Sequence, residues 1–83
     1  MKSQKFAERI EAIRLEYGFD DSEMAKAIGL KSEEDYELYK QGVLPSDEKI
    51  EFIGRWFDIS PNYLKGYDEV RTTYTSYSLN VGN

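Results

Sequence analysis

The chain has 83 residues and a formal net charge of −5, and it contains neither cysteine nor histidine. This length predicts one domain with a small core. The missing cysteine excludes disulfides and thiolate zinc sites, and the missing histidine removes the commonest acid–base group and metal ligand. There is no run of 18 apolar residues and no charged-then-apolar leader, so we expect a cytoplasmic protein without a membrane span.

A first helix is predicted from a cap at Ser3 to about Tyr17, with Gly18 ending it. Its apolar residues recur at spacings of four, three and four, which places them on one face: Phe6, Ile10, Ile13 and Tyr17. We therefore expect this face to lie against the core.

The stretch from Asp20 to Gly42 predicts two short helices joined by a turn at Gly29. Asp20 is a good N-cap, and Glu23 three residues later completes a capping box. Ser32 caps the next helix, about residues 32–40, which Gly42 ends. A helix, a glycine turn and a second helix form the layout of a helix-turn-helix that reads DNA.

The charge of this stretch does not suit DNA. Between Asp20 and Tyr39 there are two lysines and seven acidic residues, namely Asp20, Asp21, Glu23, Glu33, Glu34, Asp35 and Glu37. Their sum is the whole net charge, because the rest of the chain holds nine acids and nine bases. Carboxylates in a first helical turn favour the macrodipole by about 0.3–1 kcal/mol each, so some acidity is ordinary. That effect does not explain why Arg, Asn and Gln are missing where a helix that reads bases needs them.

The helix at about residues 32–40 also carries aromatic side chains that could contact a partner. We expect Tyr36 to point inward together with either Leu38 or Tyr39, and the pattern leaves that choice open. A tyrosine exposed beside the acids would be a suitable anchor for a protein partner.

Two more helices follow a loop at residues 42–45. Ser46 caps a helix with a buried stripe of Ile50, Ile53 and Phe57, and Ser60-Pro61 begins a short helix that Gly66 closes. Trp56, the only tryptophan, is interpreted as a residue in the core or at its edge. After Gly66 helical periodicity is lost, which predicts a mobile terminus. Tyr77, Leu79 and Val81 on alternate residues would instead suit a short added strand.

Several segments together match a known helical pattern. They are Phe6 and Ile10, residues 21–25, Ile28-Gly29-Leu30, Tyr39-Lys40-Gln41-Gly42 ahead of Pro45-Ser46, and residues 59–66. Over about residues 4–67 the chain resembles the lambda-repressor-like, Xre-type helix-turn-helix domain. The resemblance implies a compact all-α, five-helix domain over residues 1–67 with a short irregular tail over residues 68–83. Where the family places the Ser and Gln that meet DNA, this chain has Asp20 and Asp21.

Three classes of function remain open for such a domain. Direct operator binding, as a helix-turn-helix repressor, would press carboxylates against phosphates spaced about every 1.7 Å. An antirepressor would instead bind the basic helix-turn-helix of a repressor protein, and the chain resembles phage antirepressors of the modulator-of-repression kind. The residues expected to bind that partner are Asp20, Asp21, Glu33, Glu34, Asp35, Tyr36, Glu37 and Tyr39.

The third class is an enzyme. Carboxylate pairs alone can hydrolyse sugars or hold Mg²⁺. Because the chain is a small bundle without histidine or cysteine, an enzyme is the weakest of the three hypotheses. We predict no enzymatic activity, no cofactor, no metal and no small-molecule substrate. The favoured hypothesis from the sequence is an antirepressor that blocks operator binding.

Overall fold

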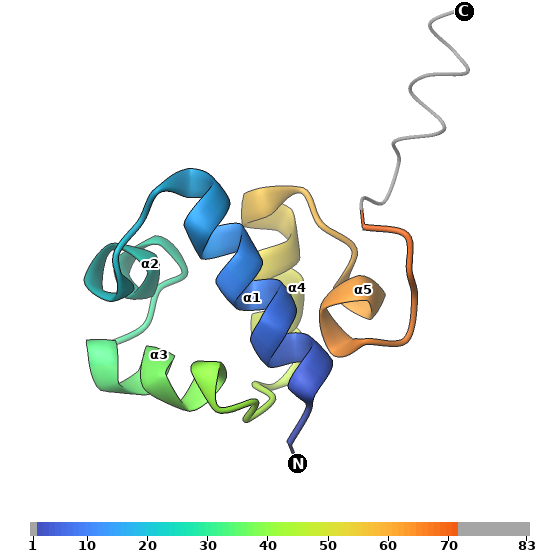
Figure 1. Ribbon diagram of the computed structural model, residues 1–83, viewed down its shortest axis with the longest axis horizontal. Helices are drawn as coiled ribbons and strands as arrows, with labels where there is room; N and C mark the ends of the chain where they lie inside the picture. The colour runs from blue at the N-terminus through green and yellow to red at the C-terminus, as the bar shows by residue number, and fades with distance from the viewer. Residues whose placement is uncertain (1, 72–83) are drawn as a thin grey trace, which may run out of the picture.

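The computed structural model describes residues 2–71, which contain five helices (Figure 1). They are α1 (Gln4–Tyr17), α2 (Asp21–Ala27), α3 (Glu33–Lys40), α4 (Asp47–Phe57) and α5 (Pro61–Lys65). Within this range the only β-type pairing is an isolated antiparallel bridge between Lys2 and Val43. The predicted all-α, five-helix class is confirmed. No helix of the described range is long and apolar enough to cross a bilayer.

Each helix begins at the polar residue that the sequence indicated. The caps accept a hydrogen bond from the backbone N–H three residues later, and they are Ser3, Asp20, Ser32, Ser46 and Ser60. At α2 the box is reciprocal, because Asp20 and Glu23 each accept the other's backbone N–H at 2.8 Å. These bonds satisfy donors that the first helical turn leaves without partners.

Two glycines set the turns on either side of α3. Gly29 has φ +73° and joins α2 to α3, a left-handed conformation that costs glycine little. Gly42 has φ +95°, and a Cβ there would lie 2.9 Å from the Ser3 carbonyl oxygen. The Ser3 N–H donates to the Gly42 carbonyl at 2.7 Å. The end of α3 is therefore fixed against the start of the chain.

One core joins all five helices. α1 crosses the middle of the molecule, with α3 packed on one part of it and α5 on another, while α2 packs on α3 and α4 on α5 (Figure 1). Its largest fully buried side chains are Phe6, Ile10, Ile13, Met24, Ile28, Tyr36, Ile50, Ile53 and Leu64. Burying a large apolar side chain contributes about 1.5–3 kcal/mol, so this set stabilises the fold.

The structure places four large side chains whose position the sequence pattern gave wrongly or left open. Tyr17, predicted on the inner face of α1, is 51% exposed, because it is the last residue of the helix, where its ring lies against Phe57 and Phe19. Trp56 is 56% exposed and packs edge-on against buried Phe57, so it lies at the edge of the core. Tyr39 is 8% exposed and Leu38 45%, so Tyr39 is the inward residue.

Residues 68–71, assigned to the tail by the sequence, lie along α1. The Arg9 guanidinium donates to the carbonyls of Tyr63 and Asp68 at 2.6 and 2.9 Å. The Arg71 guanidinium binds the Glu16 carboxylate, and the Arg71 carbonyl accepts from the Ser60 N–H at 2.7 Å. The predictions for residues 72–83, a mobile terminus or an added strand, fall outside the described residues.

Candidate functional site

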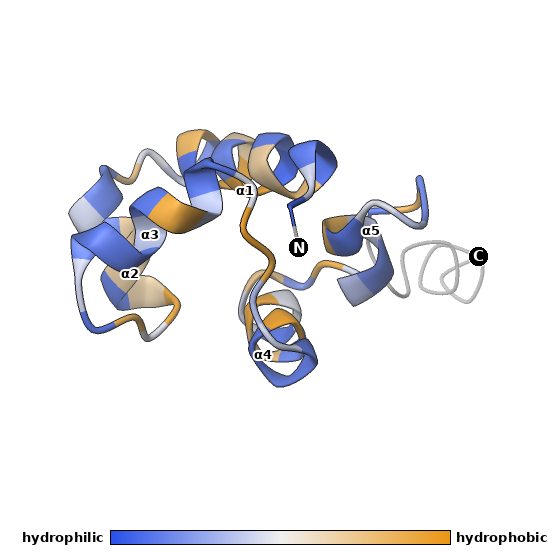
Figure 2. Cartoon of the chain, turned by 90° about the horizontal axis from the view of Figure 1, so that it is seen from below, coloured by the Kyte–Doolittle hydropathy of each residue, from blue (hydrophilic) through white to orange (hydrophobic). Residues whose placement is uncertain are grey.

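The outward side of α3 carries three glutamates. We call Glu33, Glu34 and Glu37 the acidic face. All three are exposed, and exposed Leu38 lies at its edge, one turn after Glu34. In Figure 2, α3 lies in front of α2 at one end of the molecule, and its ribbon is coloured mostly for hydrophilic residues, with one hydrophobic band.

The acidic face has little compensating positive charge. Among residues 2–71, Glu33 and Glu34 form no ion pair, and the Glu37 carboxylate lies 3.8 Å from the Lys40 ammonium. An open depression of about 450 Å³ lies here, lined by Ser32, Glu33, Glu34 and Glu37. The arrangement therefore presents negative charge to solvent on a rigid helix.

Tyr36 and Tyr39 do not belong to this surface, which corrects their expected role as partner anchors. Tyr36 is fully buried, and its hydroxyl donates to the Glu11 carboxylate. Tyr39 packs edge-on against Phe6 with ring centroids 5.5 Å apart. A short helix has one inward face, and two residues three positions apart occupy it here.

Asp21 also has a structural position. Its carboxylate lies 2.8 Å from the Lys40 ammonium and 3.5 Å from the Arg14 guanidinium. Arg14 in turn binds Glu11 at 2.9 Å, so these residues and Tyr36 form one set that joins α1, α2 and α3. We call Glu11, Arg14, Asp21, Tyr36 and Lys40 the junction network. Asp21 is only 24% exposed and is neutralised locally, so it adds little to a binding surface.

The pKa values follow from these contacts. The hydrogen bond from Arg14, with a further one from Tyr36, lowers the pKa of Glu11 despite its partial burial. Burial, reinforced by the Glu11 carboxylate that its hydroxyl meets, raises the pKa of Tyr36. The hydrogen bond to Asp21 raises the pKa of Lys40. At neutral pH Glu11 is therefore ionised beside the Arg14 cation, and Tyr36 is a neutral hydroxyl that donates to Glu11.

The remaining two predicted residues are Asp20 and Asp35. Asp20 is exposed, but its carboxylate caps α2. Asp35 is partly buried on the Tyr39 side of α3, where burial and then the Asp35 charge raise the pKa of Tyr39 to about 12. Of the eight predicted residues, Glu33, Glu34 and Glu37 line one open depression. Asp20 and Asp21 line a neighbouring depression of about 320 Å³, which they share with Glu33.

Leu38 is the surface residue that sequence reasoning did not select. Two residues correspond to about 200° around a helix and three to about 300°, so Leu38 lies nearly opposite Tyr36 while Tyr39 lies beside it. The 3.6-residue helical period, applied to residues 36–39, would have predicted from the sequence that the Leu38 side chain is exposed.

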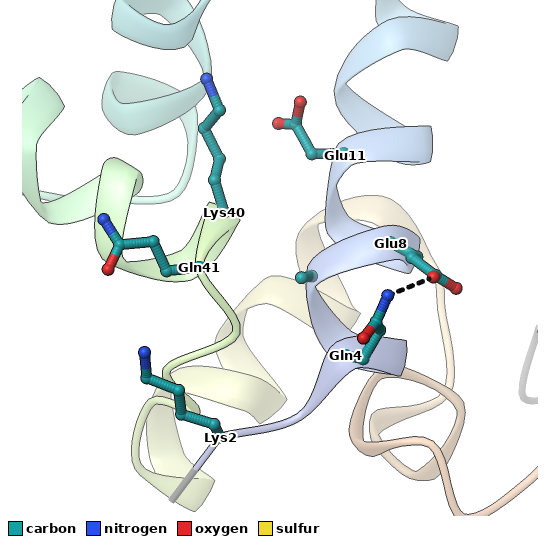
Figure 3. Close-up of a pocket in the computed structure, with 7 residues that line it drawn as sticks. Lys2, Gln4, Glu8, Glu11, Lys40 and Gln41 are labelled. Atoms are coloured by element: carbon teal, nitrogen blue, oxygen red, sulfur yellow. Dashed lines mark hydrogen bonds between the residues drawn. The ribbon is translucent and has the colours of Figure 1, made fainter.

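A second hollow lies between α1 and the end of α3, and it has a volume of about 570 Å³ (Figure 3). It is lined by Lys2, Gln4, Ala7, Glu8, Glu11, Lys40 and Gln41. Glu11 and Lys40 at one end are committed to the junction network, and Glu8 accepts from Gln4 at 3.1 Å (Figure 3). Among residues 2–71, no group of three or more acidic side chains is placed to hold a metal ion. The lining mixes both signs of charge and selects no single ligand chemistry.

Comparisons with known proteins do not assign the chain to a family. No family model matches it, and no curated protein or solved structure is significantly similar to it.

Proposed function

We propose that this chain is a helix-turn-helix protein of the lambda-repressor-like kind that regulates transcription in the cytoplasm as an antirepressor. Its acidic face binds the basic DNA-reading helix of a repressor protein and so blocks the operator from that helix. The all-α bundle and the α2–Gly29–α3 arrangement support the domain type. The target is defined by chemistry: a helix rich in Arg and Lys.

The observation that carries this proposal is the outward side of α3. In a helix-turn-helix that reads DNA, the second helix of the motif, which corresponds to α3, enters the major groove and presents Arg, Asn or Gln to base edges. Here the exposed acidic positions are Glu33, Glu34 and Glu37, with no ion pair on the first two within residues 2–71. Two like charges at 4 Å repel by about 1 kcal/mol in water and about 4 kcal/mol at an effective dielectric of 20. The same charges attract a basic helix.

Leu38 supplies the apolar contact that the tyrosines cannot. It is 45% exposed at the edge of the acidic face, where a partner side chain can cover it. Interfaces typically surround a few apolar anchors with a charged rim, and the anchors control dissociation. A Leu38→Ala variant should raise the dissociation rate of the complex without changing the association rate.

The proposal is tested by gel shift with each basic helix-turn-helix repressor encoded in the same genome, its operator and this chain. The chain should release operator DNA from one repressor and should show no saturable binding to operator DNA alone at physiological salt. Sequence-specific retention of operator DNA by the chain alone at nanomolar concentration would instead establish it as a direct DNA-binding repressor.

The role of charge is tested with a triple variant, Glu33→Gln, Glu34→Gln and Glu37→Gln. Association with the repressor should slow, and its dependence on salt should flatten, because complementary charge acts mainly on encounter. A matched control changes the net charge equally on α4 and its cap, with Glu48→Gln, Glu51→Gln and Asp58→Asn, all exposed. The control should bind like the unaltered chain. A triple variant that binds the repressor normally and gains DNA affinity would show that the acids only repel DNA.

A further inference from the structure

The outer side of α4, turned away from its buried residues, carries two large aromatic side chains. Phe52 and Trp56 lie one turn apart on this side of the helix, and they are 40 and 56% exposed. In Figure 2, α4 lies below the other helices, and none of the described helices covers its lower side. Scattered exposed apolar residues are normal, whereas adjacent ones mark a surface for contact with another molecule.

Two charged side chains of opposite sign lie beside these rings. Glu51 and Arg55 are both exposed, and they are also one turn apart. Within residues 2–71 neither forms an ion pair, not even with the other. Lys49, by contrast, donates to the Ile28 carbonyl at 3.0 Å and lies over the Phe52 ring. Glu51 and Arg55 therefore offer one open charge of each sign next to an apolar surface.

A second copy of the chain is the occupant that these side chains fit. In a two-fold dimer, residue i of one copy contacts residue j of the other, and j contacts i. Along α4, Glu51 and Arg55 form one edge of the outer side, and Phe52 and Trp56 form the other. When two such helices run antiparallel, like edges meet. Glu51 of each copy then faces Arg55 of the other, and in the same register Phe52 faces Trp56.

Other partners fit this surface less well. A partner with only basic or only acidic groups would pair one of the two open charges and face the other with a like charge. Glu48, one turn before Glu51 and Phe52, lies at the rim of the antiparallel contact, where its exposed carboxylate stays in water. The surface is therefore complementary to itself.

We propose that two copies of this chain form a weak symmetric dimer through antiparallel contact of their α4 helices. An aromatic side chain buries about 150–250 Å² when it is fully covered, so the four half-exposed rings would bury about 300–500 Å². Stable interfaces bury about 1,200–2,000 Å², so this dimer dissociates on dilution and is not populated at nanomolar concentration. The inference does not depend on the function proposed above, because it uses no residue of the acidic face.

Sedimentation velocity of the full-length protein between about 1 µM and 1 mM covers the range in which weak interfaces associate. The unaltered protein should pass from monomer to dimer over this range. Trp56→Ala should raise the dissociation constant about tenfold or more, because aromatic residues at the centre of a contact supply most of its binding energy. The matched control is Leu15→Ala, which removes a 66% exposed apolar side chain from α1 and should leave the constant unchanged.

A charge exchange tests the antiparallel register. Glu51→Arg and Arg55→Glu each turn both attractions of the dimer into repulsions, so either variant alone should raise the dissociation constant about tenfold or more. An equal mixture of the two variants should associate like the unaltered protein, because two cations on one α4 then face two carboxylates on the other. Lys26→Glu changes an exposed charge on α2 by the same amount as Arg55→Glu and should have no effect. All these positions are exposed, so the helical circular dichroism should not change.

Three results would overturn the inference. A protein that stays monomeric over the whole concentration range does not form this dimer. A dimer that Trp56→Ala and Leu15→Ala weaken equally uses another surface. A mixture of the two charge variants that associates no better than either variant alone would show that Glu51 does not face Arg55.

Discussion

Two groups of carboxylates lie close together in this molecule and have different physical roles. In the junction network, Glu11 and Asp21 are about one quarter exposed, and each has a cationic partner within 3.0 Å, Arg14 or Lys40. On the acidic face, Glu33 and Glu34 are exposed and have no ion pair within residues 2–71. The first group holds three helices together, whereas the second lies open to solvent.

The difference shows that net charge alone does not describe a surface. Hydrogen bonds to charged groups that are partly shielded contribute about 1.5–3 kcal/mol, whereas exposed charges contribute about 0–1 kcal/mol. Mutations in the junction network should therefore change folding stability, and mutations on the acidic face should change binding. Three experiments test this division.

The largest contrast is expected between Tyr36 and Leu38, neighbours on α3 with opposite environments. Tyr36→Ala removes a fully buried ring and should lower the free energy of unfolding by about 3–5 kcal/mol. Leu38→Ala removes a half-exposed side chain and should change it by less than about 1 kcal/mol. Urea unfolding followed by circular dichroism measures both. A stable Tyr36→Ala variant would refute the packing of α3 described here.

A smaller contrast is expected between two single charge removals. Asp21→Asn weakens the contacts to Lys40 and Arg14 and should lower the free energy of unfolding by about 1–2 kcal/mol. Glu34→Gln removes an exposed charge without an ion pair in the described range and should stay within about 0.5 kcal/mol. Thermal unfolding should separate the two, since 1 kcal/mol shifts Tm by about 4–8 °C in a domain of this size. Equal effects would mean that Asp21 does not hold α2 to α3.

The smallest effect concerns pH. The Arg14 hydrogen bond lowers the folded-state pKa of Glu11 below its ordinary value of 4.5. This stabilisation is complete above that ordinary value and is lost as pH falls through the lowered folded-state pKa. The urea midpoint of the unaltered protein should therefore fall on acidification from pH about 7 to about 3. Glu11→Gln should show a smaller fall, with the ion pair of Glu16 as one of the contributions that remain. A fall of the same size in both proteins would contradict this account.

Much of the fold follows from local sequence. The five caps, the capping box at Asp20 and the left-handed turns at Gly29 and Gly42 were all predictable, because each depends on residues within about four positions. The buried faces of α1 and α4 were predictable for Phe6, Ile10, Ile13, Ile50 and Ile53, since helical periodicity alone places them. The prediction that Tyr17 faces the core was wrong, because at a helix end periodicity no longer specifies what covers a side chain.

The candidate site depended more on tertiary structure. The sequence by itself determined the five helices and the concentration of acidic residues between Asp20 and Tyr39. Only the tertiary structure decided which of those acids are open, because pairing depends on residues distant in the chain: Arg14 on α1 reaches Asp21 on α2, and Lys40 on α3 reaches the same carboxylate. Net charge follows from composition, whereas the presence of a cationic partner beside a given carboxylate follows from tertiary packing.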